Sequence, residues 1–328
     1  MPHFPPSAVR RSLLTLLAVA ACGSAAAQAS YPSKPVRLIV GFAAGTGPDI
    51  VARLLGQKLS EAWGIGVVVD NKPGAGGLIA ASEAARAAPD GYTLLLGETG
   101  QLAIAPSSYN KLPYDVQRDF APVSQVASAD FVFLVNPQKV PARNAKEFVA
   151  WAQPQKGLFM ATFGAGTPGH FGVYMLGDAL KLQPEAVHYK STGDALTGLF
   201  GGDVQGLFAS MGLAAPNVKA GKLRALATTG AARSNSLPDV PTFKEQGYPD
   251  LEFSAWFGVV APAKTPADIL AKLNADIVKV ARSPEGQTRL EDAGFRATGS
   301  SREEFARSIS ADTAKWGKAV AATGFKAD

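Results

Sequence analysis

Cysteine is almost absent from this 328-residue chain, in which Cys22 is the only one. Histidine is nearly as scarce, with His3, His170 and His188 alone. Because no cysteine pair and no H-E-x-x-H segment occurs, we expect neither a disulfide nor a metal site. A P-loop and a G-x-S-x-G elbow are also missing, which argues against a nucleotide hydrolase and an α/β-hydrolase. We expect no cofactor and no enzyme activity; a Ser-His-Asp triad stays open, since its members need be close only in space.

The charge balance is mild, with 32 basic and 27 acidic residues and a formal net charge of +5. No cluster of lysine and arginine with interleaved aromatic residues is present, so we expect no nucleic-acid partner. A slightly positive protein still attracts anionic ligands at long range. With 47% hydrophobic and 18% charged residues the composition is that of a globular protein, and the length predicts two domains.

The first 29 residues have the pattern of an export signal. Arg10 and Arg11 precede a short apolar run at residues 12–21, and a small-x-small cleavage site, Ala-Gln-Ala, ends at Ala29. The run is too short to span a bilayer, so we predict that the signal peptide, residues 1–29, is removed and that the protein resides in the periplasm. Two alternatives stay open: an uncleaved membrane anchor, and lipid attachment at Cys22.

From Lys34 onward, β patterns and helical patterns alternate. This alternation predicts an α/β fold with parallel strands and helices on both faces of the sheet. We expect strands at residues 36–40, 67–69, 93–96, 131–135, 158–163, 186–189, 204–208, 224–227 and 253–260, and helices at residues 49–63, 78–88, 144–151, 169–180, 194–200, 266–281, 284–293 and 302–323. The last three helices have no strands of their own to cover and are expected to return to the first domain. Domain 1 then comprises residues 30–130 plus 253–328 and domain 2 residues 131–252, with two crossing segments that form a hinge.

Ligands of open α/β sheets bind beyond the carboxyl ends of the strands, so the strand-to-helix loops form the candidate site. The first loop, residues 41–49, reads Gly-Phe-Ala-Ala-Gly-Thr-Gly-Pro-Asp. Its glycines let the backbone approach a ligand, and the helix N-terminus that follows favours an anion. Asp49 is expected to cap this helix and not to touch the ligand. The loop lacks G-x-G-x-x-G spacing, and Asp70 is not a convincing ribose-binding acid, so a nicotinamide enzyme is not favoured.

Three further loops carry hydrogen-bonding side chains after predicted strands. They offer Thr99 and Gln101 in the second loop, Thr167 and His170 in the third, and Lys190, Ser191 and Thr192 in the fourth. For each, a plain structural alternative stays open: a turn, a helix cap, a structural histidine or a surface lysine. Glycine-rich and hydroxyl-rich helix N-termini from two lobes could together clamp a carboxylate, which needs donors once it leaves water.

A series of short motifs runs in order along the chain. They are Tyr31-Pro32-Ser33-Lys34-Pro35-Val36-Arg37, Asn71-Lys72-Pro73-Gly74-Ala75-Gly76-Gly77, Ala88-Pro89-Asp90-Gly91-Tyr92-Thr93-Leu94-Leu95, Leu112-Pro113-Tyr114-Asp115, Ala220-Gly221-Lys222-Leu223-Arg224-Ala225-Leu226-Ala227, Leu237-Pro238-Asp239-Val240-Pro241-Thr242 and Trp256-Phe257-Gly258. Their number and order resemble the Bug receptors, the extracytoplasmic solute-binding proteins of tripartite tricarboxylate transporters. The resemblance implies a two-lobed periplasmic-binding-protein (Venus flytrap) fold. It also implies capture of a small organic carboxylate for the membrane subunits of such a transporter.

The family's use of the first loop's main chain, and of polar groups in the other loops, completes the predicted ligand-binding set. That set is Phe42, Ala43, Ala44, Gly45, Thr46, Gly47, Thr99, Gln101, Gly164, Ala165, Gly166, Thr167, His170, Lys190, Ser191, Thr192 and Ser210. We expect a monomer. The alternative function is a ligand sensor that presents its closed form to a membrane histidine kinase.

Departures from the family pattern bear on the ligand. Many relatives have acids where this chain has Gln205 and Ala209. Without an acid beside the pocket to pair with a ligand ammonium, we expect a purely anionic ligand and no amino acid. Leu102 and Phe42 near the cleft suit an apolar ligand body. The expected ligand is therefore an aliphatic di- or tricarboxylate, or an aromatic dicarboxylate such as terephthalate.

Overall fold

The computed structural model describes residues 31–162, 164–189 and 192–327. The predicted signal peptide with Cys22, and the predicted site residues Lys190 and Ser191, lie outside the described residues. Thr192 is described only as the first residue of a helix.

Strands and helices alternate through most of the described chain. The strands are β1 (Val36–Val40), β2 (Val67–Asn71), β3 (Thr93–Glu98), β4 (Phe120–Val135), β5 (Phe159–Thr162), β6 (Glu185–His188), β7 (Gly206–Ser210), β8 (Arg224–Thr228), β9 (Ser254–Pro262) and β10 (Arg296–Ala297). The helices are α2 (Gly47–Trp63), α3 (Leu78–Ala85), α4 (Ala105–Ser108), α5 (Val116–Asp119), α6 (Ala145–Ala152), α7 (Pro168–Leu180), α8 (Thr192–Gly201), α9 (Met211–Lys219), α10 (Ala267–Arg282), α11 (Pro284–Asp292) and α12 (Arg302–Thr323), with short 3-10 or π segments η2 (Ala75–Gly77), η3 (Gly100–Ile104) and η4 (Pro249–Leu251).

The strands form two parallel groups joined by antiparallel strands. The order is β2-β1-β3-β9-β4-β7-β5-β6, with β8 and β10 pairing with β4 off this path. β2, β1 and β3 are mutually parallel, as are β6, β5 and β7. The prediction of parallel strands is correct for these groups and wrong for the middle of the sheet, where β3, β9, β4 and β7 pair antiparallel. The two parallel groups run in opposite directions, because β3, β9, β4 and β7 alternate in direction. A strand between the groups therefore cannot be parallel to both.

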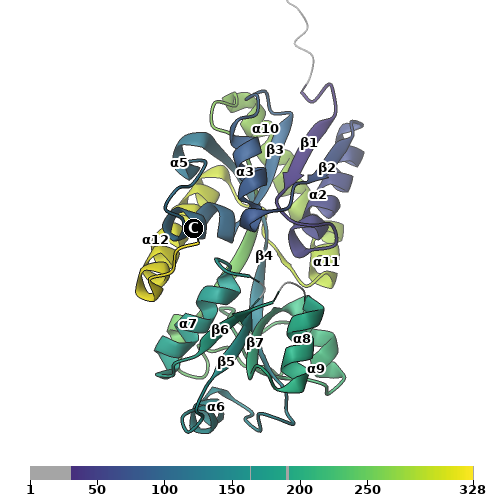
Figure 1. The fold of residues 1–328 in the computed structure, drawn as a ribbon. Coiled ribbons are helices and arrows are strands. Elements are labelled where there is room, and N and C mark those ends of the chain that lie inside the picture. Colours follow the sequence, from purple (N-terminus) through teal and green to yellow (C-terminus); the bar gives the residue numbers. More distant parts are fainter. Residues whose placement is uncertain (1–30, 163, 190–191, 328) are drawn as a thin grey trace, which may run out of the picture.

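Strand β4 passes from one group to the other. It pairs with β9 from Phe120 to Asp130 and with β7 and β8 from Phe131 onward. The chain returns through the segment between η4 and β9. The result is the predicted two-lobed α/β fold (Figure 1). We call lobe 1 the part built on β1, β2 and β3, and lobe 2 the part built on β5, β6 and β7. The predicted domain bounds at residues 130 and 252 stay a proposal.

The long helix α12 packs along lobe 1 and also reaches lobe 2. Its start is fixed by a capping box, in which Ser301 and Glu304 exchange side-chain and backbone hydrogen bonds. Trp316 is buried, with ring centroids 5.8 Å from Phe253 and 6.4 Å from Phe171 of α7. Figure 1 shows α12 beside lobe 1, above α7. The last helix therefore lies where the two lobes meet.

Two elements differ most from the sequence expectation. Strand β4 begins at Phe120, well before the expected residue 131, and helix α9 was not expected. Ser124 and Ser128 are buried within the early part of β4, where polar residues interrupt the apolar pattern. Helix α9 contains Pro216, which is unfavourable inside a helix and hides its pattern.

Candidate functional site

The first predicted loop joins β1 to α2, and Asp49 holds its shape. The buried Oδ2 of Asp49 accepts hydrogen bonds from the backbone N–H of Gly45 (2.8 Å) and from Nε of Arg53 (2.9 Å). Gly45 has a φ of +82°, which glycine adopts without strain. Burial raises the pKa of Asp49, but the hydrogen bonds from Arg53, Gly45 and Asn71 outweigh it, so the pKa lies below its ordinary value. Asp49 is thus an ionised group that folds the loop.

Asn71, at the end of the neighbouring strand β2, fixes the same loop from the side. Its Nδ2 donates to the carbonyl oxygen of Phe42 (2.9 Å) and to Oδ1 of Asp49 (2.9 Å). Val40 pairs with Asn71 in the parallel register of β1 and β2, so both strands end beside the loop. Sequence reasoning placed Asn71 in a motif without this function. The available signal was its position at the carboxyl end of a strand.

The N-terminus of α2 differs in detail from the expectation. Thr46 occupies the N-cap position, and its hydroxyl donates to the carbonyl oxygen of Ala43 (2.6 Å) without capping the helix. Asp49, the expected cap, lies within the first turn and reaches back to Gly45, so that expectation is corrected. Ala43, Ala44 and Gly45 are exposed. These residues lie at the surface of lobe 1, just before Gly47 at the helix start.

Thr99 and Gln101 lie beneath this loop, and both are fully buried. The Thr99 hydroxyl accepts the backbone N–H of Trp256 (2.8 Å). The Gln101 side chain donates to the carbonyl oxygen of Gly77 (2.8 Å) and accepts the N–H of Glu98 (3.1 Å). In this arrangement both side chains support lobe 1 from inside.

Glu98 is a buried acid at the end of β3. Its Oε1 accepts the backbone N–H of Gln101 (3.0 Å). Burial raises the pKa of Glu98 to about 7, although the backbone N–H groups of Gly100 and Gln101 oppose the shift. The carboxyl is therefore partly protonated at neutral pH, which reduces the negative charge that it contributes to lobe 1.

The loop between β5 and α7 is the corresponding feature of lobe 2. Thr167 is the N-cap of α7: its Oγ1 accepts the N–H of His170 (3.3 Å) and donates to the carbonyl oxygen of Gly164 (2.9 Å). Gly164 and Gly166 have positive φ, and Ala165 is exposed between them. The structure thus realises the cap alternative for Thr167, whose single hydroxyl hydrogen is already donated.

His170 lies in the first turn of α7 and is only 1% exposed. Its Nδ1 accepts the N–H of Gly166 (3.1 Å), so the neutral ring carries its proton on Nε2. The ring lies 4.6 Å from that of His188, whose Nδ1 is 2.6 Å from the hydroxyl of Thr162. Burial and, to a smaller extent, His188 lower the pKa of His170 to about 4. At neutral pH His170 therefore brings no positive charge to a ligand.

Ser210 differs from the predicted hydroxyls of Thr46, Thr99 and Thr167. It is the last residue of β7 and the N-cap of α9, is exposed, and makes no capping hydrogen bond to its helix. Its hydroxyl is therefore available at a helix N-terminus, where an anion is favoured. Gln205 lies at the opposite, amino end of β7, and its Oε1 accepts the N–H of Phe159 (2.7 Å). The expectation that Gln205 lies beside the pocket is thus wrong, because the direction of β7 carries it to the far end of lobe 2.

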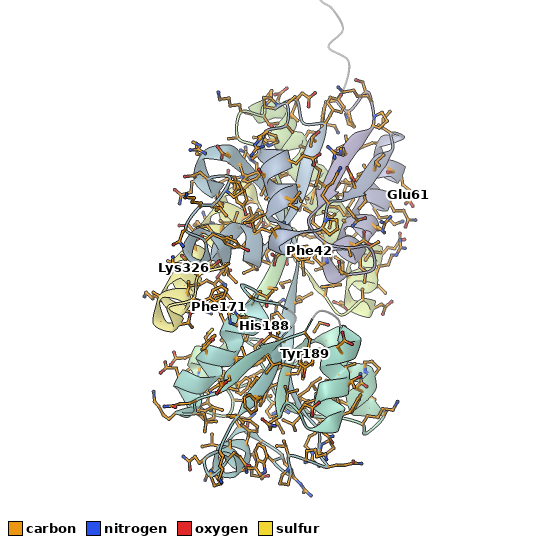
Figure 2. The ribbon with its side chains drawn as sticks, viewed as in Figure 1. Phe42, Glu61, Phe171, His188, Tyr189 and Lys326 are labelled. Atoms are coloured by element: carbon orange, nitrogen blue, oxygen red, sulfur yellow. The ribbon has the colours of Figure 1, made fainter. Side chains whose placement is uncertain are left out.

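The two halves of the predicted site face each other across the boundary between the lobes. Figure 2 shows Phe42 at the edge of lobe 1 that faces lobe 2, and His188 and Tyr189 on the side of lobe 2 that faces lobe 1. Leu102, expected near the cleft, is instead fully buried in the core. Phe42 is half-buried and is the apolar side chain at this boundary that sequence reasoning identified.

A turn of lobe 1 links the beginnings of α2 and α9. The Phe295 ring packs against Gly47, so that an added Cβ there would lie 3.3 Å from it. A Cβ added to Gly294 would lie 2.7 Å from the backbone nitrogen of Gly212, in the first turn of α9. The starts of α2 and α9 therefore contact the same turn, residues 294–295, from opposite lobes.

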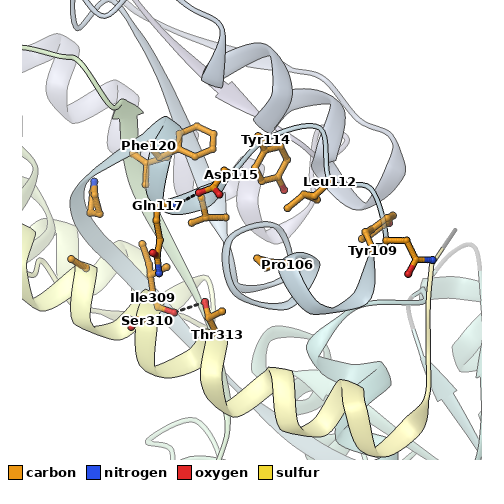
Figure 3. Close-up of a pocket in the computed structure, with 15 residues that line it drawn as sticks. Pro106, Tyr109, Leu112, Tyr114, Asp115, Gln117, Phe120, Ile309, Ser310 and Thr313 are labelled. Atoms are coloured by element: carbon orange, nitrogen blue, oxygen red, sulfur yellow. Dashed lines mark hydrogen bonds between the residues drawn. The ribbon is translucent and has the colours of Figure 1, made fainter.

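A separate cavity of about 580 Å³ lies in lobe 1, between residues 106–122 and α12 (Figure 3). Its walls include Leu112, Phe120 and Ile309, and none of its lining residues belongs to the predicted ligand-binding set. Asp115 at its rim caps α5 by accepting the N–H groups of Gln117 and Arg118. Part of the Leu112-Pro113-Tyr114-Asp115 motif is therefore structural.

Comparison with known proteins identifies the family. Residues 51–325 match the model of the tripartite tricarboxylate transporter family receptor. A UPF0065 protein of Bordetella bronchiseptica is 36% identical over 301 residues, covering 90% of this chain and 88% of the relative. An R. palustris protein solved with adipate has a TM-score of 0.81 at 32% identity, covering 90% and 99% of the two chains. MatC from Rhodopseudomonas palustris, solved with bound malate, has a TM-score of 0.77 at 32% identity, covering 88% and 100%.

The chain therefore belongs to the tripartite tricarboxylate transporter family of receptors, which are periplasmic solute-binding proteins and not enzymes. Among the described residues, no helix is long and apolar enough to cross a membrane. The same part of the chain holds no group of three or more histidine, cysteine or acidic side chains placed to bind a metal ion.

Proposed function

We propose that this receptor captures a small dicarboxylate between its lobes and delivers it to the membrane subunits of a tripartite tricarboxylate transporter. The observation that carries the proposal is that two helix N-termini, those of α2 and α9, contact the same turn from opposite lobes. One presents the main chain of the exposed residues Ala43, Ala44 and Gly45, and the other the hydroxyl of the exposed Ser210.

Neutral donors are sufficient for such a site. Each helix N-terminus has free N–H groups and a partial charge of roughly +0.5, which favours a carboxylate. Lys190, Ser191 and Thr192 remain part of the proposed site, together with the main chain of residues 164–167. His170 belongs to it as a neutral donor through Nε2.

The proposed ligand class is an aliphatic dicarboxylate. Adipate in one structural neighbour and malate in another support this class. The burial of Leu102 leaves Phe42 as the expected apolar contact, which favours a short aliphatic body over a flat aromatic one. Terephthalate is the second candidate, because the Phe42 ring could stack on it.

A ligand panel tests the proposal. Thermal unfolding of the purified protein should be followed with adipate, malate, citrate, terephthalate, glutamate and aspartate, and each hit measured by calorimetry. A ligand at 100 times its Kd adds about 2.7 kcal/mol to the free energy of unfolding. A shift with adipate or malate and none with the amino acids is expected. Binding of glutamate or aspartate alone would sink the dicarboxylate proposal.

Export and partnership complete the proposal. Removal of residues 1–29 releases the receptor into the periplasm, and mass spectrometry of the exported protein gives the new N-terminus and any lipid on Cys22. The alternative of a sensor for a histidine kinase predicts a different phenotype. Deleting the gene should abolish uptake of the ligand if the protein serves a transporter. A lost transcriptional response with normal uptake would favour the sensor.

A further inference from the structure

The segment after α12, residues 324–327, is called the tail here, and it is attached to lobe 1. Gly324, with a φ of +62°, ends the helix. The Nζ of Lys326 donates to the carbonyl oxygen of Ser107 (2.9 Å), and the N–H of Ala327 donates to that of Ser108 (2.8 Å). Ser107 and Ser108 end α4, so the tail follows lobe 1 when that lobe moves.

The same tail places an aromatic ring on lobe 2. The half-buried Phe325 ring has its centroid 4.8 Å from the ring of His170 and 5.8 Å from that of Phe171, both in α7. Figure 2 shows Lys326 above Phe171 and His188, at the boundary between the lobes. The tail therefore connects the lobes by contact, in addition to the two covalent crossings.

The aromatic rings that contact His170 come from two parts of the molecule, lobe 2 and the tail. Its ring contacts Phe171, Tyr174 and His188, which all belong to lobe 2, and Phe325, which belongs to the tail. When the lobes rotate, the contacts within lobe 2 persist because these residues move together. Of the four ring contacts, only that with Phe325 has to change.

We propose that the tail is a latch between the lobes: Phe325, held to α4, covers His170 and has to leave it before a ligand reaches that ring. The second half of this inference rests on the proposed function, since it requires a ligand between the lobes. The latch makes Phe325 a competitor of the ligand for the same histidine. Removing the Phe325 ring should therefore strengthen ligand binding, although the residue lies on a different lobe from His170.

The covering of His170 can be tested without any ligand. Of the three histidines in the chain, His3 lies in the proposed signal peptide, so His188→Gln assigns the two imidazole signals of the exported protein in a magnetic resonance titration. In the parent protein the His170 signal should titrate near pH 4. Phe325→Ala should move this titration upward by about one pH unit or more, towards the ordinary value of about 6.5. An unchanged His170 titration would overturn the latch.

The competition is tested by calorimetry with adipate and malate as probes. Phe325→Ala should bind the probe that binds the parent roughly twofold to tenfold more tightly, in keeping with the loss of one aromatic pair. Phe200→Ala is the matched control, because Phe200 is an exposed phenylalanine of α8 outside the latch. It should leave the affinity unchanged.

The outcomes separate the latch from the receptor function. If Phe325→Ala exposes His170 but leaves the affinity equal or weaker, the competition is wrong. If the parent binds no carboxylate, the proposed function fails, while the His170 titration still decides whether the tail covers the ring. If Phe200→Ala strengthens binding as much as Phe325→Ala, the effect is not specific to the latch, which is then rejected.

Discussion

Asn71 and Asp49 share a hydrogen bond of 2.9 Å that ties the carboxyl end of β2 to the first turn of α2. Because Asn71 also holds the carbonyl oxygen of Phe42, the exposed loop between Phe42 and Asp49 is fixed at both ends. A loop whose backbone is fixed before the ligand arrives loses less conformational entropy on binding. This pair is therefore the structural basis for a main-chain binding site in lobe 1.

The loop scaffold is tested by Asp49→Ala. The substitution leaves the donors of Gly45, Arg53 and Asn71 without their acceptor, so we expect a loss of about 1–3 kcal/mol in the free energy of unfolding and a weaker affinity for the dicarboxylate. Arg53→Ala is the control, because an ion-pair partner in water should contribute much less to stability. Denaturant unfolding and calorimetry measure both. Equal effects from the two variants would contradict the assignment.

Ser210 and Thr167 should respond oppositely to alanine substitution. Ser210 has an exposed hydroxyl without a capping bond, so Ser210→Ala should weaken dicarboxylate binding by about 1–3 kcal/mol with little change in stability. Thr167 caps α7, so Thr167→Ala should cost about 1 kcal/mol of stability. Calorimetry and thermal unfolding distinguish the two effects. Unchanged affinity in Ser210→Ala would remove this residue from the site.

The raised pKa of Glu98 leads us to predict that the free energy of unfolding falls as the pH rises. Its pKa is about 7 in the folded protein, whereas an unfolded glutamate has a pKa of about 4.3. Between these values the unfolded chain releases a proton that the folded protein keeps, so stability declines as pH rises through 7. Glu98→Gln should remove this decline, and its stability relative to the parent should grow by about 3 kcal/mol between about pH 4 and pH 8. A pH-independent difference would argue against a protonated Glu98.

The lowered pKa of His170 leads us to predict that the free energy of unfolding falls as the pH is lowered. The unfolded imidazole takes up a proton near pH 6.5, whereas the folded one has a pKa of about 4. Stability is therefore lost as pH falls from about 6.5 to 4. Since Glu98 opposes this trend over much of the same range, the measurement belongs in the Glu98→Gln variant. Adding His170→Gln should reduce this slope; part of it should remain, because burial also lowers the pKa of His188. An unchanged slope would contradict the assignment to His170.

Local patterns predicted most elements of the two lobes. β1 matched its apolar run, and α12 matched its bounds because Ser301 and Glu304 mark the helix start in the sequence. The early part of β4 could not be found in this way. Its buried Ser124 and Ser128 look polar in sequence, and their burial follows from pairing with β9, far along the chain.

The candidate site, too, contains residues that local sequence patterns could locate and residues that depend on contacts with distant segments. The glycine-rich loops could be located because they follow strands, and strand ends are where α/β sheets bind ligands, whereas Ser210 was reached only through the family resemblance. The roles of Gln101 and Asn71 could not, because each depends on hydrogen bonds to a different loop. The cover that Phe325 places over His170 joins the end of the chain to α7, and no sequence pattern reports such a contact.

Closure of the lobes around a dicarboxylate is the central claim, and a distance between the lobes tests it most directly. In a Cys22→Ser background, Glu61→Cys on α2 and Thr197→Cys on α8 place spin labels at exposed positions of lobe 1 and lobe 2. Pulsed electron paramagnetic resonance then gives the distribution of distances between the two spin labels, with and without saturating adipate or malate. We predict a shift to a single shorter distance with the dicarboxylate that calorimetry shows to bind. A distribution unchanged by a bound dicarboxylate would contradict capture between the lobes.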